Sequence, residues 1–410
     1  MTHSGGANDT MCSPDTQYCA IVGGGSNWIF KTAVVNGCLQ NATNGGQNPS
    51  VSVPGPFSFS RNKATPKVFY WLASNHILNQ GTIVDGTPMT FTTTSNAFFP
   101  FDFNQTNCPD VPSGTPTSAS ILGVSKNDTV FALNLSWSGG QGTGTNVFAY
   151  KPGVGCAMAD YAPNGVSSTF ANLYAYCTPP NCATATPIGT NATCYDATGG
   201  AHNTQLSLDG QTARTSGACF SRGGAGNVAL WEIATTNVQG LGPNDTVAFV
   251  GHDSLGFNKD VTNNNPHPNI RVFSPPDGTA IRTYTTLHDF PAGAPNDIEA
   301  HGGWPHPNND DNNPWIMSEE SYTSCGTNCN SPVKGQNWIW GLSVTDPLAP
   351  LIWFGPTYSA GTNSSFGCNQ TIPSVSQDGN WIFFLSDDLG TAGLDSGSGP
   401  LCRVHVYHLQ

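Results

Sequence analysis

The stretch Pro373-Ser-Val-Ser-Gln-Asp-Gly-Asn-Trp-Ile-Phe-Phe-Leu-Ser-Asp-Asp388 decides the fold of this chain. Its Asp-Gly pair is followed at once by a short aromatic and β-branched run. A second, alternating run, Val404-His-Val-Tyr407, comes after a polar loop. Short apolar runs bounded by Gly, Asp, Asn and Pro are typical of β-strands, and an Asp-Gly pair between two such runs predicts a hairpin with a type I′ turn.

Both runs recur along the chain. The turn with its apolar strand returns as Ser125-Lys-Asn-Asp-Thr-Val-Phe-Ala, Ser207-Leu-Asp-Gly-Gln-Thr-Ala and Pro243-Asn-Asp-Thr-Val-Ala-Phe. The second run returns as Asn146-Val-Phe-Ala-Tyr150, Asn227-Val-Ala-Leu-Trp231, Asn269-Ile-Arg-Val-Phe273 and Asn337-Trp-Ile-Trp340, with fainter copies in Asn27-Trp-Ile-Phe30 and Lys67-Val-Phe-Tyr-Trp71. A unit this small cannot bury both faces of its sheet alone, so the pattern predicts repeated sheets that pack on one another.

The last unit resembles the blade repeat of TolB-like β-propellers, which runs Pro-x-x-Ser-x-Asp-Gly, an apolar strand, Ser-Asp and an Ile-Tyr strand. The units between about residues 120 and 273 resemble this repeat in part. We therefore predict an all-β fold, a β-propeller of seven blades with long disulfide-bearing loops. Residues 1–410 are expected to form a single domain, in which residues 1–20 are an N-terminal extension for assembly or ring closure. A pair of β-sandwiches is the alternative.

The composition limits the class of protein. Only 10% of the 410 residues are charged, with four Glu and seven Lys, against about 25% charged residues in ordinary soluble domains. Helices built on Glu, Lys and Arg are therefore excluded. Apolar runs such as Trp381-Ile-Phe-Phe-Leu385 are far shorter than the roughly 18 residues of a membrane span. A net charge of −13 without a basic cluster argues against nucleic acid as a partner.

The cysteines indicate an oxidising compartment. Thirteen Cys are scattered among Gly- and Asn-rich segments, and such cysteines predict disulfides, with one thiol left over because the number is odd. The first residues contain no apolar signal core, so we expect a secreted protein whose leader is not part of this numbering. Nine Asn-x-Ser/Thr sequons are present, roughly what chance predicts in a chain so rich in these residues, so glycosylation is only weakly indicated.

Histidine and acidic residues gather in one region. Residues 250–320 hold five of the ten His and three of the four Glu. Aligning the units places His202 opposite His301, each seven residues before a turn, on the strand expected to run along the central channel of a propeller. Imidazole titrates near neutrality and ligates metals, so these side chains could bind an anion or a metal, or act in acid–base chemistry. The ligand-binding candidates are His202, His252, His301, His306, Glu299 and Arg271.

Other readings stay open. Glu319 and Glu320 occupy a position that is polar in several units, which favours a hydrogen-bonding role at the end of a strand. Asn- and Asp-rich loops offer oxygen ligands for Ca²⁺, and the calcium candidates are Asp310, Asp311, Asp387 and Asp388. Aromatic residues that could stack on sugar rings are Trp28, Trp71, Trp304 and Trp353.

These observations favour a secreted, non-catalytic propeller that serves as a binding or self-assembly module, with a homo-oligomer, a polymer or filament, or an extracellular glycan as partner. The alternative is a secreted polysaccharide-active enzyme, a lyase or hydrolase, with a His/carboxylate site at the channel. No nucleophile elbow, phosphate loop or His-Glu-x-x-His motif occurs in the sequence. The sequence assigns no catalytic residue.

Overall fold

The computed structural model describes these residues: 12–23, 26–32, 34–35, 38–39, 51–86, 88–112, 114, 116, 118–119, 122–136, 146–160, 171–191, 204–207, 209–219, 227–243, 246–250, 253–258, 269–273, 284–289, 298–303, 315–321, 338–342, 350, 352–356, 374–375, 381–386 and 403–408.

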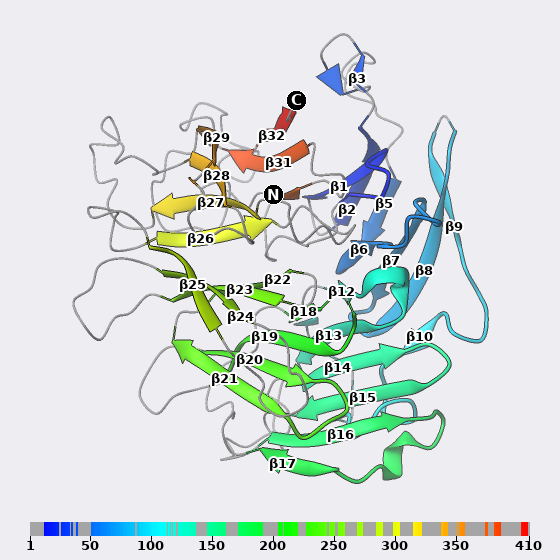
Figure 1. Ribbon diagram of the computed structural model, residues 1–410. Coiled ribbons are helices and arrows are strands. Elements are labelled where there is room, and N and C mark those ends of the chain that lie inside the picture. The colour runs from blue at the N-terminus through cyan, green and yellow to red at the C-terminus, as the bar shows by residue number, and fades with distance from the viewer. Residues whose placement is uncertain are drawn as a thin grey trace.

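Antiparallel sheets follow one another along the chain, and we number them in that order (Figure 1). The first sheet holds β1 (Tyr18–Gly23), β2 (Ser26–Lys31) and β5 (Val51–Pro54), and a small hairpin pairs β3 (Val34–Val35) with β4 (Cys38–Leu39). The second sheet holds β6 (Phe57–Phe59), β7 (Val68–Ala73), β8 (Ile77–Val84), β9 (Thr90–Thr93) and β10 (Phe101–Asp102).

The third sheet is the largest. It holds β11 (Ser118–Ala119), β12 (Gly123–Val124), β13 (Phe131–Ser136), β14 (Asn146–Lys151), β15 (Gly155–Asp160), β16 (Ala171–Cys177) and β17 (Gly189–Asn191). The fourth sheet holds β18 (Thr204–Leu206), β19 (Thr212–Cys219), β20 (Asn227–Glu232) and β21 (Val238–Pro243).

Three more sheets complete the described part of the chain. The fifth holds β22 (Thr246–Val250), β23 (Asp253–Asn258), β24 (Asn269–Phe273) and β25 (Tyr284–Asp289). The sixth holds β26 (Ile298–Gly303), β27 (Trp315–Ser321), β28 (Trp338–Leu342) and β29 (Ile352–Pro356). The seventh holds β30 (Ser374–Val375), β31 (Trp381–Ser386) and β32 (Arg403–His408). Short 3₁₀ turns at Lys126–Asp128 and Cys182–Thr184 are the helical elements of the described residues.

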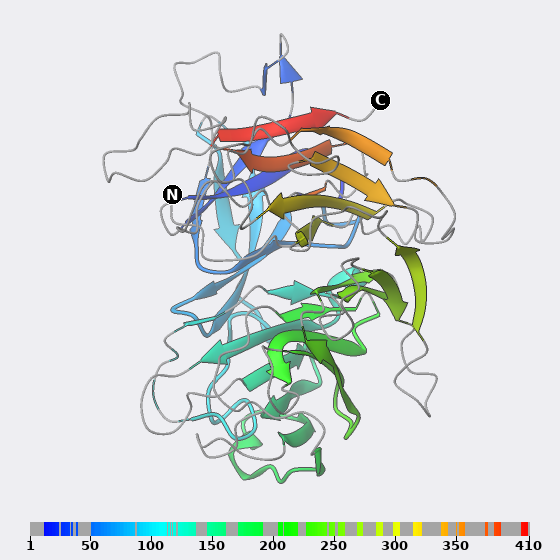
Figure 2. The ribbon, with the colours of Figure 1, turned by 90° about the vertical axis from the view of Figure 1, so that its left-hand side faces the viewer.

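The sheets are arranged as in a propeller. The first strands of successive sheets contact one another, from β12 to β18, β22, β26 and β30, and the remaining strands of each sheet lie outward from them (Figures 1 and 2). The structure therefore confirms an all-β, propeller-like fold, whereas the number of blades stays a prediction. The second run of the repeat forms the third strand in the third to seventh sheets, as β14, β20, β24, β28 and β32.

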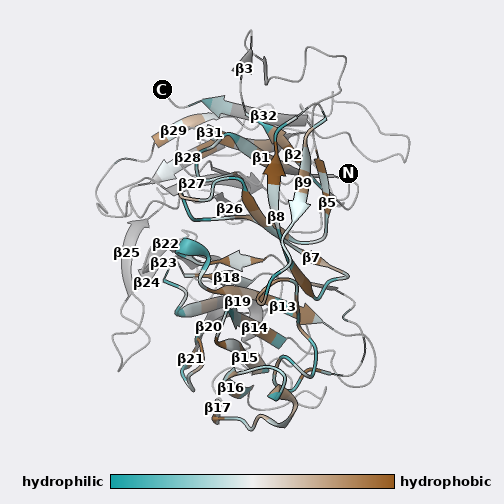
Figure 3. Ribbon diagram, turned by 90° about the vertical axis from the view of Figure 1, so that its right-hand side faces the viewer, coloured by the Kyte–Doolittle hydropathy of each residue, from teal (hydrophilic) through white to brown (hydrophobic). Residues whose placement is uncertain are grey.

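Apolar side chains fill the spaces between neighbouring sheets. Clusters of buried residues join the first sheet to the second, the second to the third, the third to the fourth and the sixth to the seventh. Phe69, Phe131 and Trp231 are completely buried there, and burying a large apolar side chain stabilises the fold by about 1.5–3 kcal/mol. Figure 3 shows hydrophobic residues along strands such as β7.

The last sheet also packs against the first. Trp381 on β31 lies against a cluster of Cys12, Cys19 and Phe30, and the views in Figures 1 and 2 both place β31 and β32 beside β1 and β2. The Cys12–Cys19 disulfide contributes to this cluster. Packing of apolar side chains thus joins the two ends of the described chain.

The repeated turn is built around a serine. Ser207 donates its amide to the Thr212 carbonyl and its hydroxyl to Asp209 Oδ1, while the Thr212 amide donates to Ser207 Oγ. The predicted two-residue type I′ turn is therefore wrong: four residues lie between Ser207 and Thr212. The reason is that the serine hydroxyl, rather than its carbonyl, accepts the closing amide, and the carbonyl is left to accept from Gly210.

The same turn occurs twice more among the described residues. Ser13 repeats it in full with Asp15 and Tyr18, and Thr16 stands where the fourth sheet has Gly210. The loop that starts at Ser125 repeats its backbone bonds. The Ser13 copy lies inside the predicted N-terminal extension and has Thr16 in place of the glycine of the Asp-Gly pair, so sequence reasoning missed it.

One assignment of the repeat is wrong. Pro243-Asn-Asp-Thr-Val was predicted to be the turn of a hairpin, yet β21 ends at Pro243 in the fourth sheet and β22 begins at Thr246 in the fifth. The segment therefore connects two sheets. An Asn-Asp pair suits either kind of turn, and the serine that organises the hairpin turns is absent here.

Three disulfides are formed among the described residues: Cys12–Cys19, Cys108–Cys156 and Cys177–Cys182. They confirm the expected disulfide-bearing loops. No helix in the part of the chain described is long and apolar enough to cross a membrane.

Candidate functional site

The predicted histidine site lies partly on the inner strands. Glu299 and His301 are both on β26, the first strand of the sixth sheet, which contacts β22 and β30. The sequence predicted this position for the strand of His301. In register, Glu299 pairs with Glu320 and His301 with Ser318. Arg271 lies on β24, the third strand of the fifth sheet, so the topology does not bring it to the same strand.

The other predicted ligands lie outside the described residues, and their roles stay predictions: His202, His252, His306, Asp310, Asp311, Asp387 and Asp388. Within the described ranges, no three His, Cys, Asp or Glu side chains come together as metal ligands would.

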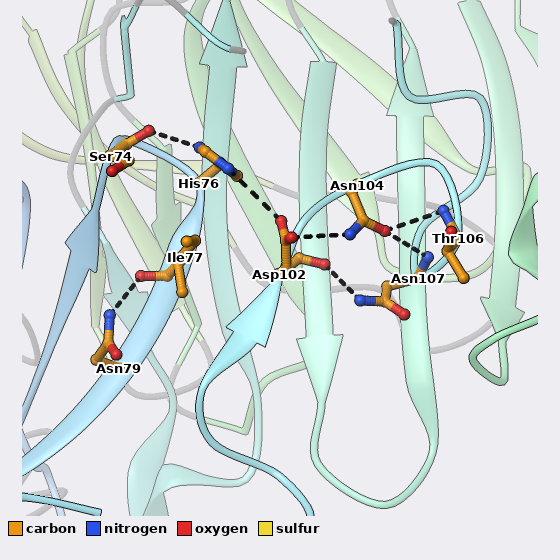
Figure 4. Close-up of polar contacts among 8 residues, drawn as sticks. All are labelled: Ser74, His76, Ile77, Asn79, Asp102, Asn104, Thr106 and Asn107. Atoms are coloured by element: carbon orange, nitrogen blue, oxygen red, sulfur yellow. Dashed lines mark hydrogen bonds and ion pairs between the residues drawn. The ribbon is translucent and has the colours of Figure 1, made fainter. Parts of the chain in front are cut away.

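A polar cluster that sequence reasoning missed lies on the second sheet (Figure 4). His76 follows the β7–β8 turn, where Ser74 and Asn75 adopt positive φ angles of 50° and 65°. Its Nδ1 lies 2.6 Å from the Ser74 carbonyl, and its Nε2 lies 3.7 Å from Oδ1 of Asp102 on β10. The Phe103 amide donates to the His76 carbonyl, so backbone and side chain both join the hairpin to β10.

Two asparagines hold Asp102 in place. Asn104 Nδ2 donates to Asp102 Oδ2 at 2.8 Å, and Asn107 Nδ2 donates to the Asp102 carbonyl at 2.9 Å. Asn104 Oδ1 in turn accepts the amides of Thr106 and Asn107. The spacing Asp102-x-Asn104-x-x-Asn107 is the sequence signal for this loop, since Asn favours such local side chain–backbone turns. Its meeting with His76 is a tertiary contact.

A second carboxylate, Asp128, joins the second and third sheets from the turn after β12. It accepts hydrogen bonds from the hydroxyls of Ser60 and Tyr70 and from the Arg61 amide, at 2.6, 3.0 and 2.9 Å. Burial raises the pKa of Asp128 above its ordinary value, and these hydrogen bonds offset part of that rise. Asp128 is therefore a half-buried group that ties two sheets together.

A third carboxylate, Asp85, joins the first and second sheets at the surface. Lys31 and Lys67 each place their Nζ 2.6 Å from one of its oxygens, and the Tyr18 hydroxyl donates to it at 2.8 Å. The hydrogen bonds from Lys31, Lys67 and Tyr18 lower the pKa of Asp85 well below its ordinary value. Burial, together with Asp85, raises the pKa of Tyr18. Two of the chain's seven lysines thus serve this one contact.

The predicted sugar-stacking aromatics separate into different environments. Trp71 is buried and packs against the rings of Phe69 and Phe91, so its predicted availability to a sugar is wrong: the first and second sheets close over it. Trp28 is 45% exposed on β2. One sequon residue, Asn134, is buried and accepts a hydrogen bond from Thr204, which removes it as a glycosylation site of the folded protein.

Comparison with known proteins supports the fold. No protein-family model matches the chain, and no curated protein matches its sequence. Among solved structures, an oligogalacturonate lyase from Vibrio parahaemolyticus is similar over 99% of this chain and 90% of its own, with a TM-score of 0.51 and 9% identity. TolB from Acinetobacter baumannii is similar over 64% of this chain and 50% of its own, with a TM-score of 0.31 and 13% identity. The oligogalacturonate lyase is a β-propeller, so the chain shares a propeller-like fold with it.

Proposed function

We propose that this chain is a secreted, seven-bladed β-propeller that serves as an extracellular binding or self-assembly module. The observation that carries the proposal is the structural use of its acidic side chains. Asp15 and Asp209 brace turns, while Asp85 and Asp128 join neighbouring sheets. Carboxylates committed to such contacts stabilise a scaffold, and the three disulfides suit an oxidising, extracellular setting.

The proposal includes a single domain over residues 1–410, closed at its ends. The packing of Trp381 on Cys12, Cys19 and Phe30 supports this, because it brings the first and last sheets together. Residues 1–20 would then belong to ring closure. The exposed side chains of Trp28 and Phe98, 45% and 43% exposed, offer apolar contact area for a second copy or a glycan.

The second candidate is a polysaccharide-active enzyme, a lyase or a hydrolase. The observation that favours it is the placement of Glu299 and His301 together on β26, an inner strand. A histidine and a carboxylate can share acid–base work on a sugar. The shared fold with an oligogalacturonate lyase suggests acidic oligosaccharides as the first substrates to try.

Electron microscopy of the natively secreted protein, without detergent and at working dilution, tests the first proposal. Regular polymers are the expected result for a self-assembly module. Single particles that turn over acidic polysaccharides would refute it, provided that His301→Ala lowers the turnover and leaves the melting temperature unchanged. A His301→Ala variant that only melts earlier would mark His301 as structural. EDTA tests separately whether calcium binds at Asp310, Asp311, Asp387 and Asp388. If it does, removing calcium lowers the melting temperature by several degrees; if it does not, the melting temperature stays unchanged.

A further inference from the structure

Two disulfides meet on neighbouring strands of the third sheet. Cys156 lies on β15 and Cys177 on β16, and the register of these strands places the two cysteines directly opposite each other. Cys177 Sγ lies 3.3 Å from the Cys156 carbonyl oxygen. The two cysteines are nevertheless bonded elsewhere, Cys156 to Cys108 and Cys177 to Cys182. Opposite positions on paired strands thus belong to two different disulfides.

Directly opposite positions on antiparallel strands suit a disulfide. Their Cα atoms are about 4.5 to 5.5 Å apart, within the roughly 4.4 to 6.8 Å that a disulfide spans. Their side chains also lie on the same face of the sheet. The protein contains one example, because Cys12 and Cys19 form an antiparallel bridge and are bonded to each other. A disulfide between Cys156 and Cys177 is therefore compatible with the strand pairing of the third sheet.

The disulfides differ in their exposure to solvent. Cys108, Cys156 and Cys182 are 0% exposed, whereas Cys177 is half-buried. Thiol–disulfide exchange requires access to the sulfur that is attacked, so a thiolate from solution reacts first at Cys177 and breaks its bond to Cys182. The Cys12–Cys19 disulfide is shielded, since both of its residues are only 1% exposed.

We infer that these four cysteines form one thiol–disulfide exchange unit, in which reduction of Cys177–Cys182 by a small thiol leads to a Cys156–Cys177 disulfide and frees Cys108. Two thiol groups of the reductant reduce Cys177–Cys182 and become a disulfide themselves. The Cys177 thiolate then attacks Cys156 Sγ, the Cys108–Cys156 bond breaks, and Cys108 leaves as a thiolate that takes up the proton that Cys177 lost. The products are one protein disulfide, two protein thiols and the oxidised reductant, so atoms and electrons balance.

The exchange changes how the second and third sheets are joined. Cys108 ends the loop that follows β10 of the second sheet, and its disulfide attaches this loop to β15 of the third sheet. The new disulfide would lie within the third sheet and join β15 to β16. A thiol would therefore release the loop from the third sheet. This inference goes beyond the proposed function and applies to a binding module and to an enzyme alike.

Partial reduction of the native, full-length protein tests the exchange. Dithiothreitol is added at a concentration that leaves Cys12–Cys19 intact, samples are quenched with acid over time, free thiols are blocked with N-ethylmaleimide, and disulfide-linked peptides are mapped by mass spectrometry. We expect a linked Cys156–Cys177 peptide pair to appear early, together with blocked Cys108 and Cys182. Blocked Cys177 and Cys182 with an intact Cys108–Cys156 disulfide would overturn the inference.

A double variant separates exchange from direct reduction of Cys108–Cys156. In Cys177→Ser/Cys182→Ser the attacking thiol is absent. Blocking of Cys108 under the same conditions should then be slower by about tenfold or more than in the wild type, because a neighbouring thiolate acts at a high effective concentration. Equal rates in the variant and the wild type would show that the reductant attacks Cys108–Cys156 directly, and would refute the exchange.

A single variant tests the second step without any reductant. Cys182→Ser leaves Cys177 as a thiol opposite Cys156, so we expect the purified variant to contain the Cys156–Cys177 disulfide with Cys108 free to react with N-ethylmaleimide. Cys182→Ser protein in which Cys108–Cys156 alone is formed and Cys177 is blocked would contradict the proposed attack.

Discussion

Opposite substitutions at equivalent turn positions should change stability in opposite directions. Gly210 and Thr16 occupy the same place in two copies of the serine turn, and both have left-handed φ angles, 73° and 59°. A β-carbon in this region costs about 1–2 kcal/mol. At Gly210 that carbon would also lie 2.9 Å from Val130 Cγ2 and 3.2 Å from Ser125 Cβ.

The free energies follow from these contacts. Gly210→Ala adds the backbone cost and an overpacking cost of about 1–3 kcal/mol, less about 0.5–1 kcal/mol for the lower entropy of the unfolded chain. We therefore expect a loss of about 2–4 kcal/mol. Thr16→Gly removes the backbone cost and a buried hydroxyl, Thr16 Oγ1, that has no hydrogen-bond partner among the described residues. Glycine also raises the entropy of the unfolded chain, and the buried methyl group of Thr16 is lost. After these two costs are subtracted, we expect the free energy of unfolding to increase by about 1 kcal/mol.

Urea unfolding followed by tryptophan fluorescence measures both changes. Gly114→Ala is the control, because Gly114 has a φ of 106° and no atom within 4 Å of an added β-carbon. It should cost about 1 kcal/mol, the backbone contribution less the same entropy of the unfolded chain. The reasoning fails if Thr16→Gly destabilises the protein, or if Gly210→Ala costs no more than Gly114→Ala.

Two further predictions concern the links between sheets. Because burial raises the pKa of Asp128, the folded state binds its proton more tightly than the unfolded chain does, so its contribution to stability is complete at low pH and is lost as the pH rises through the folded pKa. The stability of the wild type relative to Asp128→Asn, from urea unfolding at pH 4 to 7, should therefore increase as the pH falls, and a constant difference would contradict this. Replacing both cysteines of Cys108–Cys156, which are 48 residues apart, by serine should cost about 4 kcal/mol, whereas Cys177–Cys182, five residues apart, should cost about 2 kcal/mol. Equal losses would refute the loop-entropy argument.

Sequence reasoning nominated some of the residues of the candidate site and missed others. Clustering of His and Glu pointed to β26, and the structure places Glu299 and His301 there on an inner strand. The same reasoning passed over His76, because nothing within a few residues marks it. Its partner Asp102 is 26 positions away in sequence, and Asp128 meets Tyr70 across 58 positions.

The sequence by itself determined the all-β class, the repeated turn and strand, and the disulfide-bearing loops. The repeated turn depends on interactions between near neighbours, such as those of Ser207 with Asp209 and Thr212, which any chain with this local pattern can form. Only the tertiary structure decided that β21 and β22 belong to different sheets, that Trp71 is buried, and that His76, Asp85 and Asp128 join distant segments. Such contacts depend on how neighbouring sheets are placed, and the free energy that places them comes from burial of apolar surface summed over many side chains.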